Sequence, residues 1–237
     1  FTEDNCPGLA SNNVFSLHKS VDGPLYIGTS QGCAKYDPDR DVISEIEELR
    51  GDFIYDITED TKGYLWFACY YTGLYKYDKA HSIWKHYLHD PKVPQSICSN
   101  KVLNTFIDDR GNLYICTEGG GVCKYDYTTD CFLPFRLTKD GENVSLTIVY
   151  GMQNDANGNL WLSSNDGIWI CSINGEIIRH LTQEDGLQSN QYNFGATFRS
   201  STGKLFFGGI NGFNVFNSEK IEDNTILPVV TARINYK

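Results

Sequence analysis

Short alternating runs of apolar and polar residues recur along this chain and predict β-strands joined by tight turns. In the clearest unit, residues 102–107 and 113–117 form two such runs, separated by an Asp/Gly turn. A glycine loop, a third run at 122–125 and a frayed fourth at 131–135 complete it. Four short antiparallel strands of this kind make one small sheet.

The same unit occurs five times, as a turn glycine, an apolar residue, an aromatic residue and, six or seven residues later, a second glycine. The spacings between the repeated aromatics are 40, 48, 47 and 45 residues, and the aromatics are Tyr26, Trp66, Tyr114, Trp161 and Phe206. A period of about 40–50 residues containing only strands and turns is typical of propeller blades. We therefore predict an all-β fold, a β-propeller of about five four-stranded antiparallel blades, either weakly closed or an open arc.

The repeat boundaries predict blades near residues 9–48, 49–97, 98–142, 143–186 and 187–220, within a propeller that spans 1–224. The chain starts with Phe1 rather than Met, and the fifth unit shows no fourth strand, so we expect a segment of a longer protein. Residues 226–235 form one apolar strand without a following turn. We interpret 225–237 as the truncated first strand of a different β domain.

Charge narrows the range of partners. The formal net charge is −10 and the sequence pI is about 4.9, whereas nucleic acids and anionic lipids select basic surfaces. No apolar run approaches the length of about 18 residues that a membrane-spanning helix needs. We expect no nucleic acid partner and no direct membrane contact.

The eight cysteines show neither a Cys-x-x-Cys pair nor a zinc-like spacing. Several occupy repeat-equivalent strand positions, among them Cys33, Cys69, Cys116 and Cys123. Unpaired cysteine is among the most buried residue types, so we predict mostly buried free thiols. A cross-strand bridge between Cys116 and Cys123 is the expected exception.

Residues 185–193 and 203–217 closely resemble the final repeat of the two-component regulator propellers, and residues 25–38 and 65–78 resemble the same repeat. Residues 228–231 resemble the entry to the immunoglobulin-like domain that follows those propellers. The resemblance implies the non-catalytic, periplasmic sensor region of a Bacteroidetes-type hybrid two-component system. Such a region recognises an oligosaccharide or other small glycan and signals to a histidine kinase that controls transcription. It also implies a neighbouring propeller and the immunoglobulin-like domain as partners within one protein, and a homodimer.

Propeller ligands usually bind on the face that carries the loops between second and third strands and the connections between blades. Amides, carboxylates and exposed rings suit a sugar, whose hydroxyls need paired donors and acceptors while its C–H faces stack on rings. Packing against a neighbouring blade is the alternative for the tyrosines, and turn capping is the alternative for the asparagines. The candidate ligand-binding residues are Gln31, Tyr70, Tyr71, Glu118, Asn165, Asp166, Asn190, Tyr192 and Asn211.

No residue pattern predicts catalysis, a metal site or a cofactor. The loops at 108–112 and 155–159 superficially resemble calcium loops, but both lack the downstream bidentate Glu and sit at the shared hairpin turn. The histidines His81, His86 and His89 cluster on an outer fourth strand, away from the central channel. A lactonase-like or lyase-like propeller enzyme and a scaffold that binds only protein remain the alternatives to a sensor.

Overall fold

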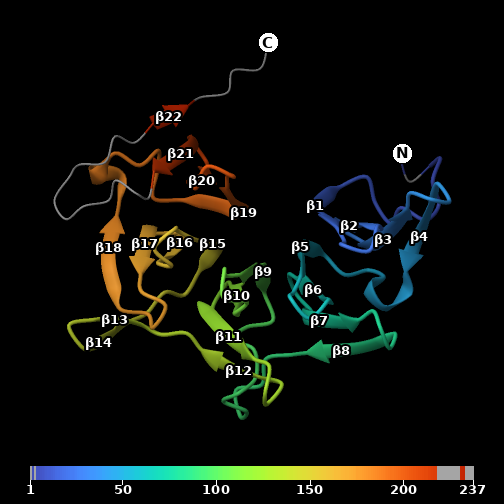
Figure 1. Ribbon diagram of the computed structural model, residues 1–237, viewed down its shortest axis with the longest axis horizontal. Coiled ribbons are helices and arrows are strands. Elements are labelled where there is room, and N and C mark those ends of the chain that lie inside the picture. The colour runs from blue at the N-terminus through green and yellow to red at the C-terminus, as the bar shows by residue number, and fades with distance from the viewer. Residues whose placement is uncertain (1, 3, 218–229, 233–237) are drawn as a thin grey trace.

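The computed structural model describes residue 2, residues 4–217 and residues 230–232. Five four-stranded antiparallel sheets fan out around a common axis, which confirms the predicted β-propeller (Figure 1). Apart from two short 3-10 turns, η1 (Glu47–Leu49) and η2 (Gln183–Asp185), these residues contain no helix. No helix in this part of the chain is therefore long and apolar enough to cross a membrane.

Within each blade the strands pair in chain order, first to fourth. Blade 1 holds β1 (Val14–Lys19), β2 (Leu25–Thr29), β3 (Gly32–Asp37) and β4 (Val42–Ile46), and blade 2 holds β5 (Ile54–Glu59), β6 (Tyr64–Cys69), β7 (Gly73–Asp78) and β8 (Ile83–Tyr87). Blade 3 holds β9 (Val102–Ile107), β10 (Leu113–Thr117), β11 (Val122–Asp126) and β12 (Cys131–Pro134). Blade 4 holds β15 (Val149–Asn154), β16 (Leu160–Ser164), β17 (Gly167–Cys171) and β18 (Ile177–Leu181). Blade 5 holds β19 (Tyr192–Arg199), β20 (Lys204–Gly209), β21 (Gly212–Asn217) and β22 (Val230–Ala232), and a separate hairpin, β13 (Leu137–Lys139) with β14 (Glu142–Val144), joins blades 3 and 4.

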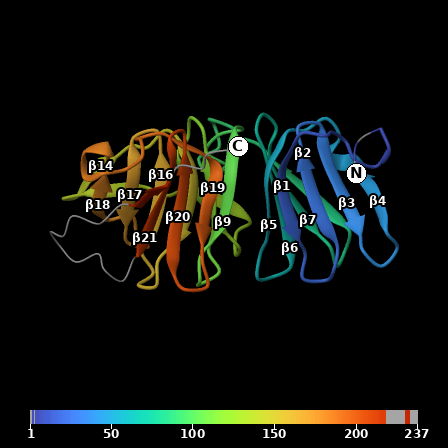
Figure 2. The same cartoon turned by 90° about the horizontal axis from the view of Figure 1, so that it is seen from above.

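The blades form an open arc whose two ends are blade 1 and blade 5 (Figures 1 and 2). The first strands lie innermost and the fourth strands outermost, and each first strand packs against the next. At the two ends of the arc these inner strands carry exposed apolar side chains. Leu17 on β1 is 64% exposed, and Phe198 on β19 is 62% exposed.

A buried aspartate closes the turn between first and second strands in the three middle blades. In blade 2, Asp60 Oδ1 accepts the backbone N–H groups of Lys62 and Tyr64, and Oδ2 accepts the indole N–H of Trp66 at 2.8 Å. Asp155 makes the equivalent bonds in blade 4. The carboxylate oxygens are thus occupied by N–H donors, as expected for a structural turn and not for a calcium loop.

The repeated rings of blades 1 to 4 fill the spaces between neighbouring sheets, whereas Phe206 in blade 5 is only partly buried. Trp66, Tyr114 and Trp161 are each 0% exposed, and each belongs to a different one of the four buried clusters that join successive blades. Burying a side chain of this size stabilises the fold by about 1.5–3 kcal/mol. The sequence repeat therefore marks the residues that hold blade to blade.

All eight cysteines are free thiols, as predicted for most of them, but the predicted Cys116–Cys123 bridge is wrong. Cys116 pairs with Val122, whereas Cys123 pairs with Ile115. Since directly paired residues share a face and alternate residues point oppositely, the two thiols lie on opposite faces of the sheet. Cys116 packs between blades 3 and 4, and Cys123 between blades 2 and 3.

The fifth sheet has a fourth strand, β22, which lies within the apolar run at 226–235 that was expected to belong to another domain. Residues 230–232 pair antiparallel with β21, so that Phe213 lies opposite Ala232. The remainder of the segment 225–237, and the propeller end expected at residue 224, lie outside the described residues. The assignment of 225–237 to a separate domain stays a prediction.

We expect Asp60→Ala to destabilise the protein by about 2–4 kcal/mol, because each buried donor left without an acceptor costs about 1–3 kcal/mol. Chemical unfolding of the purified chain measures this. Asp126→Ala is the matched control, since Asp126 caps an exposed turn through Thr128 and Thr129, and it should cost less than about 1 kcal/mol. Equal losses in the two variants would contradict a special role for the buried turn.

Native alkylation should distinguish two groups of thiols. Burial raises the pKa of Cys171 to about 12 and also raises the pKa of the other buried thiols, so few thiolates form and reagent access is blocked. Peptide mapping after iodoacetamide treatment of the folded protein should find label on the partly exposed thiols alone, and unfolding should add the rest. Label on the buried group in the folded state would refute the packing. The partly exposed thiols are Cys6, Cys98 and Cys131, and the buried thiols are Cys33, Cys69, Cys116, Cys123 and Cys171.

Candidate ligand-binding face

A cluster of aromatic side chains lies on the face where the chain enters the first strands. The ring of Tyr55 is central, with its centroid 5.6 Å from Phe15, 5.0 Å from Tyr70 and 4.9 Å from Phe194. The Tyr150 ring of blade 4 lies 5.6 Å from that of Phe194, so rings from blades 1, 2, 4 and 5 are in contact across the arc. We call this set the mouth cluster, and its members are Phe15, Phe53, Tyr55, Tyr70, Tyr71, Tyr150 and Phe194.

A β-bulge that repeats from blade to blade builds the mouth cluster. The pairing of the first and second strands skips one residue in each of blades 1 to 4, and these residues are Phe15, Tyr55, Leu103 and Tyr150. In blade 5 the irregular stretch is longer, from 193 to 196, and includes Phe194. A bulge changes the direction of a side chain relative to the regular pleat, and bulges are common beside binding sites. The repeat therefore presents a ring at the mouth from blades 1, 2, 4 and 5, whereas the equivalent Leu103 of blade 3 is buried.

The mouth cluster offers both apolar surface and polar groups. Tyr71 is 66% exposed, Phe15 49% and Phe194 45%, so their rings face solvent. The hydroxyls of Tyr55, Tyr71 and Tyr150 make no hydrogen bond to any residue in the described part of the chain. Rings with free hydroxyls suit a ligand that is apolar on one side and polar at its edges.

A fixed charge pair borders the rings. The Tyr70 hydroxyl donates to Glu118 Oε2 at 2.6 Å, and the Lys101 ammonium lies 2.6 Å from Glu118 Oε1. Hydrogen bonds from Lys101, which has the larger effect, and from Tyr70 lower the pKa of the Glu118 carboxyl. The Glu118 carboxylate in turn raises the pKa of Lys101. Lys101 also lies 5.7 Å from the centroid of the Tyr70 ring. This edge of the mouth carries an acceptor and a donor that are held in place.

The structure brings together three of the residues expected from the sequence, Tyr70, Tyr71 and Glu118. Gln31 lies exposed on the loop between β2 and β3, in blade 1 at one end of the arc. Asn165, also exposed, lies on the loop between β16 and β17 in blade 4.

The remaining expected residues have local roles. Asp166 is exposed next to His180, and Asn211 donates from both its backbone and side-chain nitrogens to Gln188. Asn190 Oδ1 accepts the backbone N–H of Gln183 at 2.6 Å, which is the capping role considered as the alternative. Tyr192 is 3% exposed, and its hydroxyl donates to Asn214 Oδ1, so its ring is part of the core rather than the surface.

The sequence reasoning did not identify Phe15, Tyr55, Tyr150 and Phe194. Their spacing, together with the equivalent Leu103, is 40, 48, 47 and 44 residues, which nearly repeats the spacing of the blade aromatics. This shared repeat period is the sequence feature from which the four mouth residues could have been predicted.

The outer histidines do not come together at the mouth. His86 stacks on Tyr75 with centroids 3.9 Å apart, and His81 bonds Asp78. His89 bonds the carbonyl of Ile97. No group of three or more metal-binding side chains is placed to hold an ion in the residues that the structure describes.

Residues 48–71, which run from η1 to the loop after β6, match the family described as two component regulator propeller. Over these residues the match confirms the resemblance to the two-component regulator propellers that was inferred from the sequence. The chain is 26% identical to histidine kinase P4 of Formosa agariphila, over an alignment of 282 residues covering 96% of this chain and 20% of the relative. The chain therefore spans about a fifth of that relative's length.

Two solved structures show the same fold. The extracellular domain of a hybrid two-component system from B. thetaiotaomicron superposes with a TM-score of 0.72 at 20% identity, covering 89% of this chain and 29% of that one. A catalytically inactive virginiamycin B lyase from Staphylococcus aureus gives a TM-score of 0.63 at 14% identity, covering 95% and 71%. At these identities the similarity concerns the propeller fold and not the activity.

We expect Lys101→Met to raise the pKa of Glu118 toward its ordinary range, because the variant loses the ammonium that favours the carboxylate. In the native protein the pKa is lowered, so the carboxylate contributes stability above its ordinary pKa and loses it as the pH falls through the folded-state value. A carbon-detected NMR titration of the Glu118 carboxyl measures the change. Lys92→Met, at an exposed turn, is the control and should leave the titration as it was; identical titrations in all three proteins would show that Lys101 is not the cause.

Proposed function

We propose that this chain is a non-catalytic, ligand-sensing propeller that acts in the periplasm as part of a hybrid two-component system. The repeat family and the similarity to a histidine kinase support the sensor role. The extracellular domain that shares the fold supports the location. In this proposal the neighbouring propeller and the immunoglobulin-like domain belong to the same protein, and the assembled receptor is a homodimer.

We further propose that the ligand is an oligosaccharide and that it binds at the mouth cluster. The observation on which this depends is the contact of seven rings, three of them 45–66% exposed, beside unbonded tyrosine hydroxyls. Sugar rings stack their C–H faces on aromatic side chains. In this site the sugar hydroxyls would form hydrogen bonds with the tyrosine hydroxyls and with the Glu118–Lys101 pair. An extended glycan also suits a site assembled from several blades.

Binding at this place would connect the ends of the arc. Tyr55 belongs to blade 2 and Phe194 to blade 5, yet their rings are 4.9 Å apart. A ligand that stacks on Phe15 and Phe194 together would hold blades 1 and 5 in one relative position. A ligand shifts a conformational equilibrium only by its differential affinity for the two states, and such bridging provides that difference. The change then passes to the domains that follow and to the kinase.

Tyr71→Ala and Phe194→Ala should each weaken oligosaccharide binding by about five- to thirtyfold, because the loss of a stacking ring costs about 1–2 kcal/mol. Calorimetric titration of a glycan panel into the chain, and into a complete extracytoplasmic region, gives the affinities. Tyr36→Ala is the matched control, since Tyr36 lies near the other end of blade 1 and bonds Asp41. Its affinity should equal that of the native protein.

Two results would count against the proposal in different ways. Unchanged affinity in both ring variants, with folding confirmed by circular dichroism, would refute the mouth cluster as the site. The absence of glycan binding by the complete extracytoplasmic region, tested with a broad panel, would refute the ligand class.

A further inference from the structure

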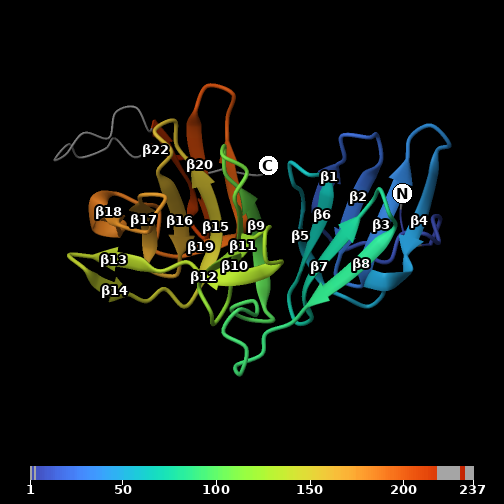
Figure 3. The ribbon, with the colours of Figure 1, turned by 60° about the horizontal axis from the view of Figure 1, so that its bottom comes forward.

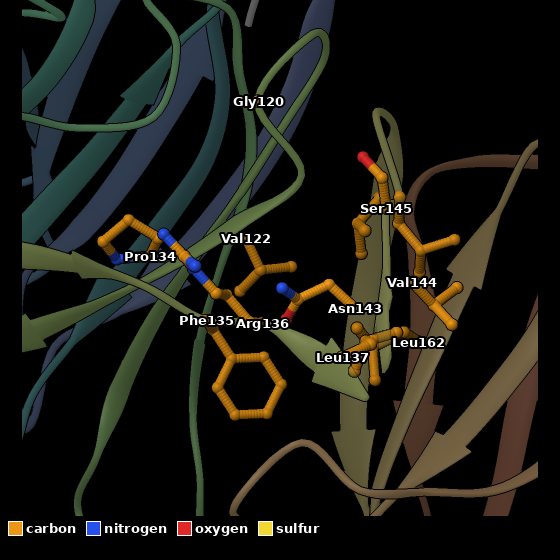
Figure 4. Close-up of a pocket in the computed structure, with 12 residues that line it drawn as sticks. Gly120, Val122, Pro134, Phe135, Arg136, Leu137, Asn143, Val144, Ser145 and Leu162 are labelled. Atoms are coloured by element: carbon orange, nitrogen blue, oxygen red, sulfur yellow. The ribbon is translucent and has the colours of Figure 1, made fainter. Parts of the chain in front are cut away.

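A cavity of about 310 Å³ lies between blades 3 and 4, apart from the mouth cluster. Figure 4 shows side chains from both blades and from the intervening hairpin around it. Its apolar lining includes buried residues of three strands, since Val122 is on β11, Val149 on β15 and Leu162 on β16. Leu137 and Val144 on the hairpin add to the apolar part, as do Pro134, Phe135 and Leu146 beside it.

One wall of the cavity is an insertion into the repeat. The β13–β14 hairpin lies at the outer edge of the molecule near β18, and in the described residues no other connection between blades contains a hairpin (Figure 3). The backbone N–H of Thr138 donates to the carbonyl of Gly175 at 2.8 Å, and Thr138 bridges Glu176. Leu137, 3% exposed, anchors the hairpin in the core. Insertions in repeat proteins often mark binding faces, and this one is held firmly against blade 4.

The rim of the cavity carries three polar side chains, Arg136, Asn143 and Ser145. All three are exposed. Arg50 bonds Glu45 and Arg199 bonds Asp109, but the Arg136 guanidinium makes no ion pair with any residue in the described part of the chain. In a chain of net charge −10, an arginine without a carboxylate partner beside an apolar cavity is a distinctive arrangement.

We propose that this cavity binds a small carboxylic acid that carries an apolar ring or chain. The carboxylate pairs with Arg136, whose planar fork matches it with two hydrogen bonds. The apolar part fills the space over Val122, Val149 and Leu162, and Asn143 and Ser145 are available for further polar groups. A volume of about 310 Å³ is at the lower end of the range of about 300–1,000 Å³ for small-molecule sites, so the ligand is small. The site is additional to the mouth cluster and does not depend on the proposed sensor function.

Three probes separate the two parts of this interaction: phenylacetate has both the ring and the charge, phenylacetamide has the ring alone, and acetate has the charge alone. Methyl NMR spectra recorded during titration, with the Val144 and Leu162 signals as reporters, give the affinities. We expect phenylacetate to bind most tightly, with saturable shifts confined to the cavity.

The Arg136→Gln variant tests the role of the guanidinium. It should weaken phenylacetate binding about tenfold or more, to the level of phenylacetamide, and should not change phenylacetamide binding. Arg40→Gln is the matched control because Arg40 is 82% exposed in blade 1, and it should change neither affinity.

A second variant tests the cavity itself. Ser145→Trp places a large ring at the exposed rim and should abolish binding of both aromatic probes without affecting the core. Tyr71→Ala, in the mouth cluster, should leave phenylacetate binding unchanged, so failure here is distinguishable from failure of the oligosaccharide proposal. No saturable shift with phenylacetate, or equal affinity in the native protein and Arg136→Gln, would overturn the inference.

Discussion

The fold depends above all on a bond between a buried carboxylate and a ring at the first turn of each middle blade. Asp60 satisfies the backbone of its turn and at the same time accepts the indole N–H of Trp66. It also accepts the hydroxyl of Tyr127 in the next blade at 2.9 Å. A single carboxylate thus fixes the turn, orients the ring that fills the interface and connects two sheets. Removing it leaves several buried donors without acceptors, which is far more costly than losing one exposed contact.

That constraint has a consequence at the opposite end of the strands. In blades 2 to 4 the turn and the ring fix the register near the Asp/Gly turn, and the extra residue of the first strand is accommodated where the strand begins. Blade 1 has the same bulge without that bond. At the start of these strands the bulge directs Phe15, Tyr55 and Tyr150 into the mouth, while the equivalent Leu103 is buried. The apolar surface at the mouth is thus a regular product of the repeat. The charged pair at its edge, by contrast, comes from a single blade, where Lys101 precedes β9 and Glu118 follows β10.

The repeat, the strand pattern and the turn type were predictable from the sequence, because period and turn residues are local properties. Tyr70, Tyr71 and Glu118 were predictable as well, since each lies on a loop between second and third strands. The mouth rings were not predicted, because a bulge breaks the alternation of period two from which the facing of a strand residue is inferred. The wrong prediction of a Cys116–Cys123 disulfide has a similar cause. The face of the sheet on which each thiol lies depends on the pairing register of the two strands, which the sequence does not show. Tyr192 resembled a loop residue, yet its ring is buried and its hydroxyl bonds Asn214.

Blades 1 and 5, the ends of the arc, lack the carboxylate and ring bond. Ser20 takes the place of the aspartate in blade 1 and bonds Asp22 and Glu59 instead, in a network with Lys79. In blade 5 the ring is Phe206, which has no donor to offer a carboxylate. The two blades that present Phe15 and Phe194 are therefore the two whose first turns lack the bond between a buried carboxylate and a ring. A sensor needs its ligand to contact elements that can move, and regions of low local stability are those from which moving elements are drawn. In the proposed receptor, a glycan that joins these rings acts on the two blades without the buried carboxylate, while the buried aspartates hold the turns of the middle three.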